Sequence, residues 1–193
     1  MMQHKKEVIK IEKILTIYCE SDGLMGNVFS VAVLLTDETG AEVDNRVFVS
    51  RKIKINDFYA NQIYKNLKSS NVVEVATPQE LMQVFAEFYK TVKDNYKVLY
   101  HTGEVVETGF FRDLVKNGYL TTSDLPYLPI ELSSILQFLG EDANNVEVFN
   151  KKYDIVVNGN LSDPVFDCRK TYACYKFIEH NLISLKFSED QVI

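Results

Sequence analysis

The sequence lacks the cysteine pattern of a disulfide framework or a structural zinc site. It has three cysteines, Cys19, Cys168 and Cys174, and no two of them form a CxxC pair. Disulfide-rich secreted domains typically carry an even set of cysteines, and structural zinc sites typically carry paired ones. We therefore expect three reduced thiols in a cytoplasmic protein.

Long apolar runs and an excess of basic residues are also missing. The chain has no stretch of about 18 apolar residues, the length that a membrane-spanning helix needs. Its charged start, MMQHKKEVIKIEK, has no apolar core of a signal peptide. The formal net charge is -6 and no basic tail occurs, so the composition gives no support for charge-driven binding to a nucleic-acid backbone.

What is present is enough apolar material for one core. The chain has 193 residues, of which 46% are hydrophobic, and this length lies in the range of a single domain. We expect one domain over residues 1–193.

Apolar runs and turn residues predict a mixed sheet. Residues 14–18, 28–35 and 46–55 have the composition of strands, and the run TDETGAEVD between the second and third is typical of a hairpin turn. Two further short strands are predicted at 96–101 and 127–132. We expect an α/β fold with a five-stranded sheet, made of a three-stranded antiparallel meander plus two parallel strands and flanked by helices.

Helix signals alternate with the later strands. The run TPQE predicts a helix capped by Thr77, with Glu80 completing a capping box. A second helix is predicted in TGEVVETGFFRDLVKNGY, ending at Gly118, and others in SSILQFLG, over 144–153, and from Asp163 and Pro164 onward.

Three acidic residues lie where such a fold would bring them together. Glu20 follows the first strand, Glu107 lies early in the helix after the fourth strand, and Asp167 lies one turn into the last helix. Clustered carboxylates repel one another unless a hard cation such as Mg²⁺ or Mn²⁺ neutralises them, and two such ions can promote phosphodiester hydrolysis. The alternative for each residue is an ordinary acid at a helix start or element end.

The order of these residues resembles the DEDD superfamily of 3'-to-5' exonucleases, which have a ribonuclease-H-like fold. The resemblance covers about residues 12–182. It rests on YCESDGL, on HTGEVVETGFFRDL and on SDPVFDCRKTYACY, with LPIELSSIL matching the strand and helix entry between the last two motifs. The resemblance implies that Glu20, Glu107 and Asp167 are catalytic residues and hold Mg²⁺ or Mn²⁺.

The same motifs depart from the family pattern. Tyr18 stands where the family has the Asp that bridges both metals, and a neutral phenol is a poor metal ligand. Glu107 replaces an Asp and is longer by a methylene, and Ser162 replaces the His that serves as general base. The alternative base, a Tyr four residues before Asp167, is replaced by Asp163.

Neighbouring residues offer substitutes, and each has an ordinary structural explanation. Asp22 is a further possible metal ligand but suits a solvated turn, and Glu104 or His101 would be a ligand or base. For His101 we favour a hydrogen bond to nearby backbone over catalysis. Cys19 stands beside Glu20, and we expect a buried, inert thiol rather than a nucleophile.

Two groups of side chains are candidates for nucleic-acid contact. Aromatic residues of the last helix offer stacking surfaces, although helical aromatics usually belong to a core. They are Tyr172, Tyr175 and Phe177. Lysines and an arginine near the first and third strands are candidates for basic rims, with solvated faces as the default; they are Lys5, Lys6, Lys10, Lys13, Arg51, Lys52 and Lys54.

Two functions therefore stay open. The departures favour an exonuclease-fold protein with impaired or lost catalysis that binds a nucleic acid such as a single strand or short oligonucleotide, a nucleotide, or a protein partner. The alternative is an active Mg²⁺- or Mn²⁺-dependent 3'-to-5' exonuclease with a non-standard site.

Overall fold

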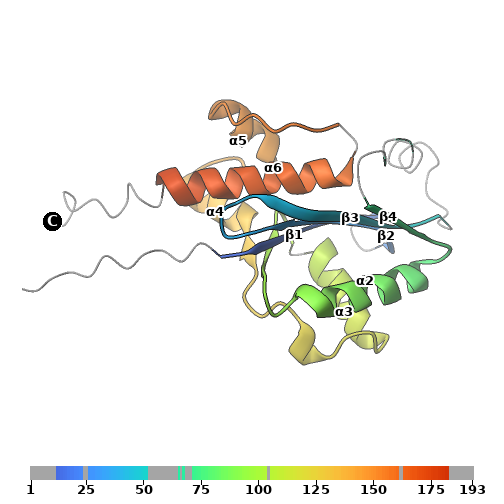
Figure 1. Cartoon of the computed structure of the whole chain (residues 1–193). Coiled ribbons are helices and arrows are strands. Elements are labelled where there is room, and N and C mark those ends of the chain that lie inside the picture. The colour runs from blue at the N-terminus through green and yellow to red at the C-terminus, as the bar shows by residue number, and fades with distance from the viewer. Residues whose placement is uncertain are drawn as a thin grey trace, which may run out of the picture.

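A six-stranded mixed sheet lies between two layers of helices in the computed structural model of the chain (Figure 1). The structure describes residues 12–23, 26–51, 65, 67, 71–103, 105–160 and 163–182. The strands are β1 (Ile14–Ser21), β2 (Val28–Thr36), β3 (Glu42–Ser50), β4 (Asn71–Val75), β5 (Lys97–Tyr100) and β6 (Ile130–Glu131). Within the described ranges, the helices of seven residues or more are α2 (Pro78–Val92), α3 (Val106–Lys116), α4 (Leu132–Leu139), α5 (Val146–Lys152) and α6 (Pro164–Phe177).

The strand order is β4-β3-β2-β1-β5-β6. Strands β1, β2 and β3 form an antiparallel meander, β5 pairs in parallel with β1, and β6 pairs in parallel with β5. These pairings confirm the predicted meander and the two predicted parallel strands.

The predicted number of five strands is wrong by one. Strand β4 adds a sixth at the far edge, in parallel with β3. Its five residues, NVVEV, are only partly buried because an edge strand has a neighbour on one side alone. This weak apolar signal is the physical reason why the sequence did not predict it. Strand β3 also begins earlier than expected, at Glu42, and ends at Ser50, with Arg51 in a bend; residues 52–55 of the predicted strand lie outside the described residues.

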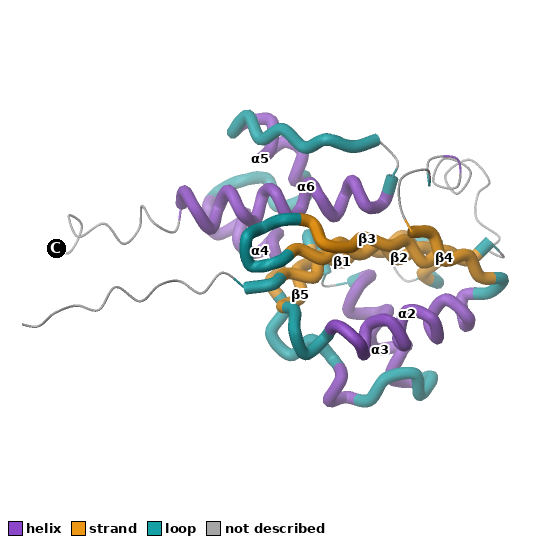
Figure 2. Tube along the Cα trace, in the orientation of Figure 1, coloured by secondary structure: helices purple, strands orange, loops and turns teal. Residues whose placement is uncertain are grey.

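Helices cover both faces of the sheet, as the tube view also shows (Figure 2). Helices α2 and α3 pack on one face around a cluster of buried aromatic residues, and α6 crosses the other face with α4 and α5 beside it. All nine residues of β2 are buried, which explains why its sequence, VFSVAVLLT, is almost continuously apolar.

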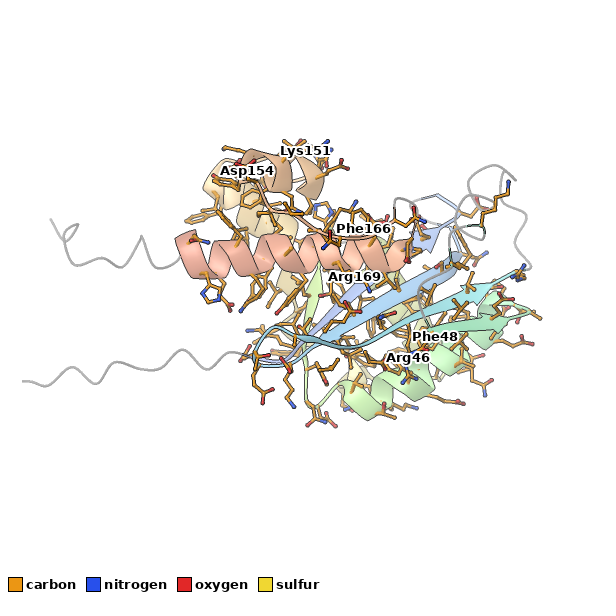
Figure 3. All side chains as sticks on the ribbon, turned by 45° about the horizontal axis from the view of Figure 1, so that its top comes forward. Arg46, Phe48, Lys151, Asp154, Phe166 and Arg169 are labelled. Atoms are coloured by element: carbon orange, nitrogen blue, oxygen red, sulfur yellow. The ribbon has the colours of Figure 1, made fainter. Side chains whose placement is uncertain are left out.

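Local signals account for how the main helices begin. Thr77 accepts a hydrogen bond from the Glu80 N–H at 3.2 Å, and the Glu80 carboxylate accepts one from the Ala76 N–H at 2.7 Å. Asp163 caps α6 by accepting from the Val165 N–H at 3.0 Å. The predicted caps at Thr77 and Asp163 are confirmed, but the predicted capping box is not formed at Thr77, because Glu80 accepts from the N–H of the preceding residue. Helix α6 is further tied to the sheet by Arg169, whose guanidinium donates to both Glu42 oxygens at 2.8 and 2.9 Å (Figure 3).

None of the described helices is both long and apolar enough to cross a membrane. The three cysteines are free and buried.

Phe85 of α2 lies at the centre of the aromatic cluster and is fully buried. Its ring centroid is 5.2 to 5.9 Å from those of four other rings, which are Phe48, Tyr89, Phe110 and Phe111. Phe85→Ala should lower the free energy of unfolding by about 3 to 5 kcal/mol, because it removes buried surface and leaves a cavity. Urea denaturation measures this loss. The exposed Lys90→Ala on the same helix is the control and should change stability by about 0.5 kcal/mol or less; an equally small effect of Phe85→Ala would contradict the described core.

Candidate active site

Strand β1 ends with Tyr18 and Glu20 on one face of the sheet, since side chains two residues apart in a strand point the same way. Tyr18 packs, partly buried, against the apolar cluster beneath α6. Its hydroxyl forms a hydrogen bond with the Glu20 carboxylate. The pairing with β2 shifts register between Glu20 and Ser21, and such bulges bend a strand and are frequent near functional sites.

Helix α3 brings Glu107 to the same end of β1. Only 5% of Glu107 is exposed, and its Oε1 accepts a hydrogen bond from the Cys19 N–H at 3.0 Å. A carboxylate is favourable in the first turn of a helix, where N–H groups have no intrahelical acceptor. Glu107 therefore ties α3 to β1 through its carboxylate.

The turn before α3 depends on Gly103. A Cβ at this position would lie 2.3 Å from Cδ2 of Tyr100, so any larger residue would clash with that ring. The Thr108 hydroxyl donates to the Gly103 carbonyl at 2.6 Å and closes the turn. This close approach sets where α3 begins and thus where Glu107 lies.

Helix α6 supplies Asp167 together with a lysine. The Lys170 ammonium lies 2.6 Å from Oδ1 of Asp167, one helical turn away, and both side chains are largely buried, with 17% and 28% exposed. Three residues apart on a helix is the spacing at which side chains meet. Asp167 thus has a cation from the protein itself.

Glu20 lies within electrostatic range of both Asp167 and Glu107, and burial dominates the titration of all three carboxyl groups. Burial raises the pKa of Glu20 to about 7, the hydrogen bond from Tyr18 opposes this rise, and the charge of Asp167 adds to it. Burial also raises the pKa of Glu107 to about 7, against the hydrogen bond from Cys19 and with a contribution from the charge of Glu20.

Asp167 behaves in the same direction. Burial raises its pKa above the usual aspartate value, and the hydrogen bond and charge of Lys170 oppose the rise. Desolvation therefore disfavours the ionised form of all three carboxyl groups, and hydrogen bonds from protein donors partly offset this effect.

Of the proposed substitutes, His101 lies within electrostatic range of Asp167, and Asp22 lies in the turn after β1. Nε2 of His101 lies 3.2 Å from the Ala143 carbonyl oxygen, which matches the favoured structural explanation, and burial lowers its pKa. Asp22 is exposed in the turn after β1, where its N–H donates to the Asn27 carbonyl at 3.1 Å. Cys19 is buried, and desolvation raises the pKa of its thiol, as an inert cysteine requires. Glu104 and Ser162 lie outside the described residues.

The described candidates for nucleic-acid contact either pack against the core or form ion pairs within the protein. The aromatic side chains of α6 are partly buried and pack against the core; they are Tyr172, Tyr175 and Phe177. Lys13 pairs with Glu38 at 3.7 Å, and Arg51 donates twice to Glu74 at 2.6 Å. The other candidate basic residues, Lys5, Lys6, Lys10, Lys52 and Lys54, lie outside the described residues.

The donor set does not suit a divalent metal as it stands. Across the described ranges, no three His, Cys, Asp or Glu side chains are grouped so that they could hold a metal ion. Mg²⁺ and Mn²⁺ require several oxygen ligands at one point. Here Glu20 is engaged by Tyr18, Glu107 by the Cys19 N–H and Asp167 by Lys170.

Two functional groups of this site were absent from the sequence prediction. The Cys19 N–H is a backbone donor, and no side-chain pattern reveals it. Lys170 had a signal, because it follows Asp167 by three residues on a predicted helix. That spacing is sufficient to predict an ion pair, although the sequence prediction did not use it.

The fold is similar to that of known 3' exonucleases. The structure superposes on E. coli Exonuclease I in complex with a dT13 oligonucleotide with a TM-score of 0.60 and 14% sequence identity, over 91% of this chain and 42% of that chain. It superposes on the nuclease domain of 3'hExo, a DEDDh family member bound to rAMP, with a TM-score of 0.60 and 12% identity, over 89% and 94% of the two chains. A full-length 3'-exonuclease gives a TM-score of 0.59 and 12% identity, over 88% and 82%.

These similarities confirm the fold resemblance inferred from the sequence. At such low identity they show the fold alone, and this chain spans less than half the length of Exonuclease I. No protein-family model matches the chain. No curated protein sequence matches it.

The burial of Glu107 predicts a pH effect. Glu107→Gln removes the acid but keeps an oxygen that accepts the Cys19 N–H. Because folding raises the pKa of Glu107 from 4.5 to about 7, its contribution to stability is complete below pH 4.5 and is lost as the pH rises through about 7. From about pH 4.5 to about pH 8, the free energy of unfolding should shift in favour of the variant by up to about 3 kcal/mol. Urea denaturation of both proteins at each pH measures this difference; a constant difference would contradict the buried carboxyl.

Proposed function

We propose that this chain is a non-hydrolysing domain with the DEDD exonuclease fold, and that it acts by binding a partner. One observation carries the proposal: each of the three carboxylates that the fold gathers is already engaged by a group of the protein. The partners are the Tyr18 hydroxyl for Glu20, the Cys19 N–H for Glu107 and the Lys170 ammonium for Asp167.

The nature of these partners argues against an enzyme. A hydrolytic site of this fold class needs carboxylate oxygens available to cations. Tyr18 instead adds a phenol beside Glu20, and Lys170 places a fixed positive charge against Asp167. Restoring the family pattern would require changes at both Tyr18 and Ser162, and Asp167 would also have to lose its ion pair with Lys170.

Charge also bears on the kind of partner. Without a metal, the acidic end of β1 repels phosphate groups, and the only described cation paired there is Lys170, which Asp167 already engages. The net charge of -6 adds to this repulsion. A protein partner is therefore favoured over a nucleic acid.

An exposed apolar segment supports a protein partner. Tyr127 and Leu128, just before the edge strand β6, are 91% and 74% exposed. Tyrosine is enriched at protein interfaces, where it offers a large apolar area with one polar end. Neighbouring solved structures include Exonuclease I with oligonucleotides and with an SSB C-terminal peptide; for this chain we propose a protein partner only.

Metal-dependent 3'-to-5' hydrolysis remains the second candidate, because the chain retains all three acids and Glu20 lies within electrostatic range of both Asp167 and Glu107. Incubation of the purified protein with labelled single-stranded DNA, RNA and dinucleotides in Mn²⁺ separates the two. We expect no EDTA-sensitive trimming of any substrate, and no difference between the wild type and Asp167→Ala. EDTA-sensitive trimming that Asp167→Ala abolishes would establish the second candidate instead.

Oligonucleotide binding gives a separate check on the partner. Fluorescence anisotropy with labelled dT and rA oligomers should show no saturable binding by the wild type at low salt, with or without Mg²⁺, because phosphates meet uncompensated carboxylates. Tyr127→Ser/Leu128→Ser should leave this result unchanged. Binding that weakens steeply with added salt would overturn the preference for a protein partner.

A further inference from the structure

Lys170 of α6 is mostly buried and pairs with Asp167 one helical turn away. The charged end of a lysine normally reaches water, yet here only 17% of the side chain is exposed. The ammonium lies 2.6 Å from Asp167 and 5.0 Å from the centre of the Phe166 ring. The ammonium thus contacts the Asp167 carboxylate and the Phe166 ring, and the side chain also lines a cavity between α5 and α6.

Neighbouring residues hold this placement. Phe166 is packed so closely against Gly159 that a Cβ there would lie 2.1 Å from Cδ2 of the ring. The Asn150 side-chain amide donates to the Lys170 carbonyl at 3.2 Å. The ring offers a cation–π contact, and the Asn150 bond fixes the backbone of α6 beside α5. The lysine side chain thus has a defined position.

Asp167 and the two acids near it need either a positive charge or a proton. Glu20 and Asp167 interact electrostatically, as do Glu20 and Glu107, and each of the three is mostly withdrawn from water. Buried like charges are stable only when neutralised or protonated. Lys170 is the described cation in direct contact with one of them.

We propose that the Lys170 ammonium, through its ion pair with Asp167, takes the place of a divalent metal at this carboxylate and prevents metal binding there. The inference rests on the non-hydrolysing function proposed above and supplies its physical cause. A second, divalent charge next to the ammonium would be repelled by it, and Asp167 would have to break its ion pair to serve as a ligand.

Lys170→Met tests this proposal, because it keeps an apolar stem of similar length and removes the charge. Calorimetry with Mn²⁺ alone should show no saturable binding to the wild type below about millimolar metal, and binding at least about tenfold tighter to the variant. Lys170→Gln is a second variant in case the first fails to fold. Lys170→Arg keeps a cation and should behave as the wild type.

Lys151→Met is the matched control. Lys151 lies on α5 (Figure 3), lines the same cavity of about 180 Å³ as Lys170 and Phe166, and pairs with Glu147 at 2.9 Å. Its removal should leave metal affinity unchanged. Asp167→Asn combined with Lys170→Met should abolish the gain, because the released ligand is then gone.

Thermal unfolding gives a readout that is independent of activity. Without metal, Lys170→Met should melt about 3 °C lower than the wild type, since it leaves Asp167 unpaired. Mn²⁺ should restore the melting temperature of Lys170→Met and leave that of the wild type unchanged.

Two results would overturn the inference: no gain in Mn²⁺ affinity for either uncharged variant, or a gain that survives Asp167→Asn. If this happens while the wild type trims no substrate, the non-hydrolysing function stands and only the role of Lys170 is wrong. Metal-dependent trimming by the wild type would instead overturn the proposed function.

Discussion

The structure depends on how it neutralises the carboxylates that converge at the end of β1. The fold buries Glu107 almost completely and withdraws Glu20 and Asp167 from most of the solvent. Each carboxylate would be costly there without a partner. The chain meets this constraint with three different donors, namely a phenol, a backbone N–H and an ammonium.

The chain shares a fold with known exonucleases but differs from the expected exonuclease pattern in the side chains at the end of β1. The meander, the parallel strands and the crossing helix α6 give the same framework as Exonuclease I and the 3'hExo nuclease domain. A framework positions side chains but does not choose them. In this chain the end of β1 carries Tyr18, and the aspartate of α6 is paired with a lysine. The carboxylates at this place therefore bind groups of the protein itself.

Much of the framework was predictable because its signals are local. The cap at Thr77, the cap at Asp163 and the apolar β2 each predict their element from a few neighbouring residues. The edge strand β4 was missed because its pattern is short and half-exposed. Glu20, Glu107 and Asp167 were predicted to converge. The Cys19 N–H was not predicted as a partner of Glu107, since it is a backbone group 88 positions away, whereas the spacing of Lys170 from Asp167 carried a local signal.

The central claim is that Lys170, and not a metal, neutralises Asp167. A crystal structure of the wild-type protein soaked in Mn²⁺, with anomalous scattering from manganese, tests it most directly. The account predicts no manganese peak among Glu20, Glu107 and Asp167, and a Lys170 ammonium still in contact with Asp167. One or two well-occupied manganese ions bound by these carboxylates, with Lys170 displaced, would contradict it.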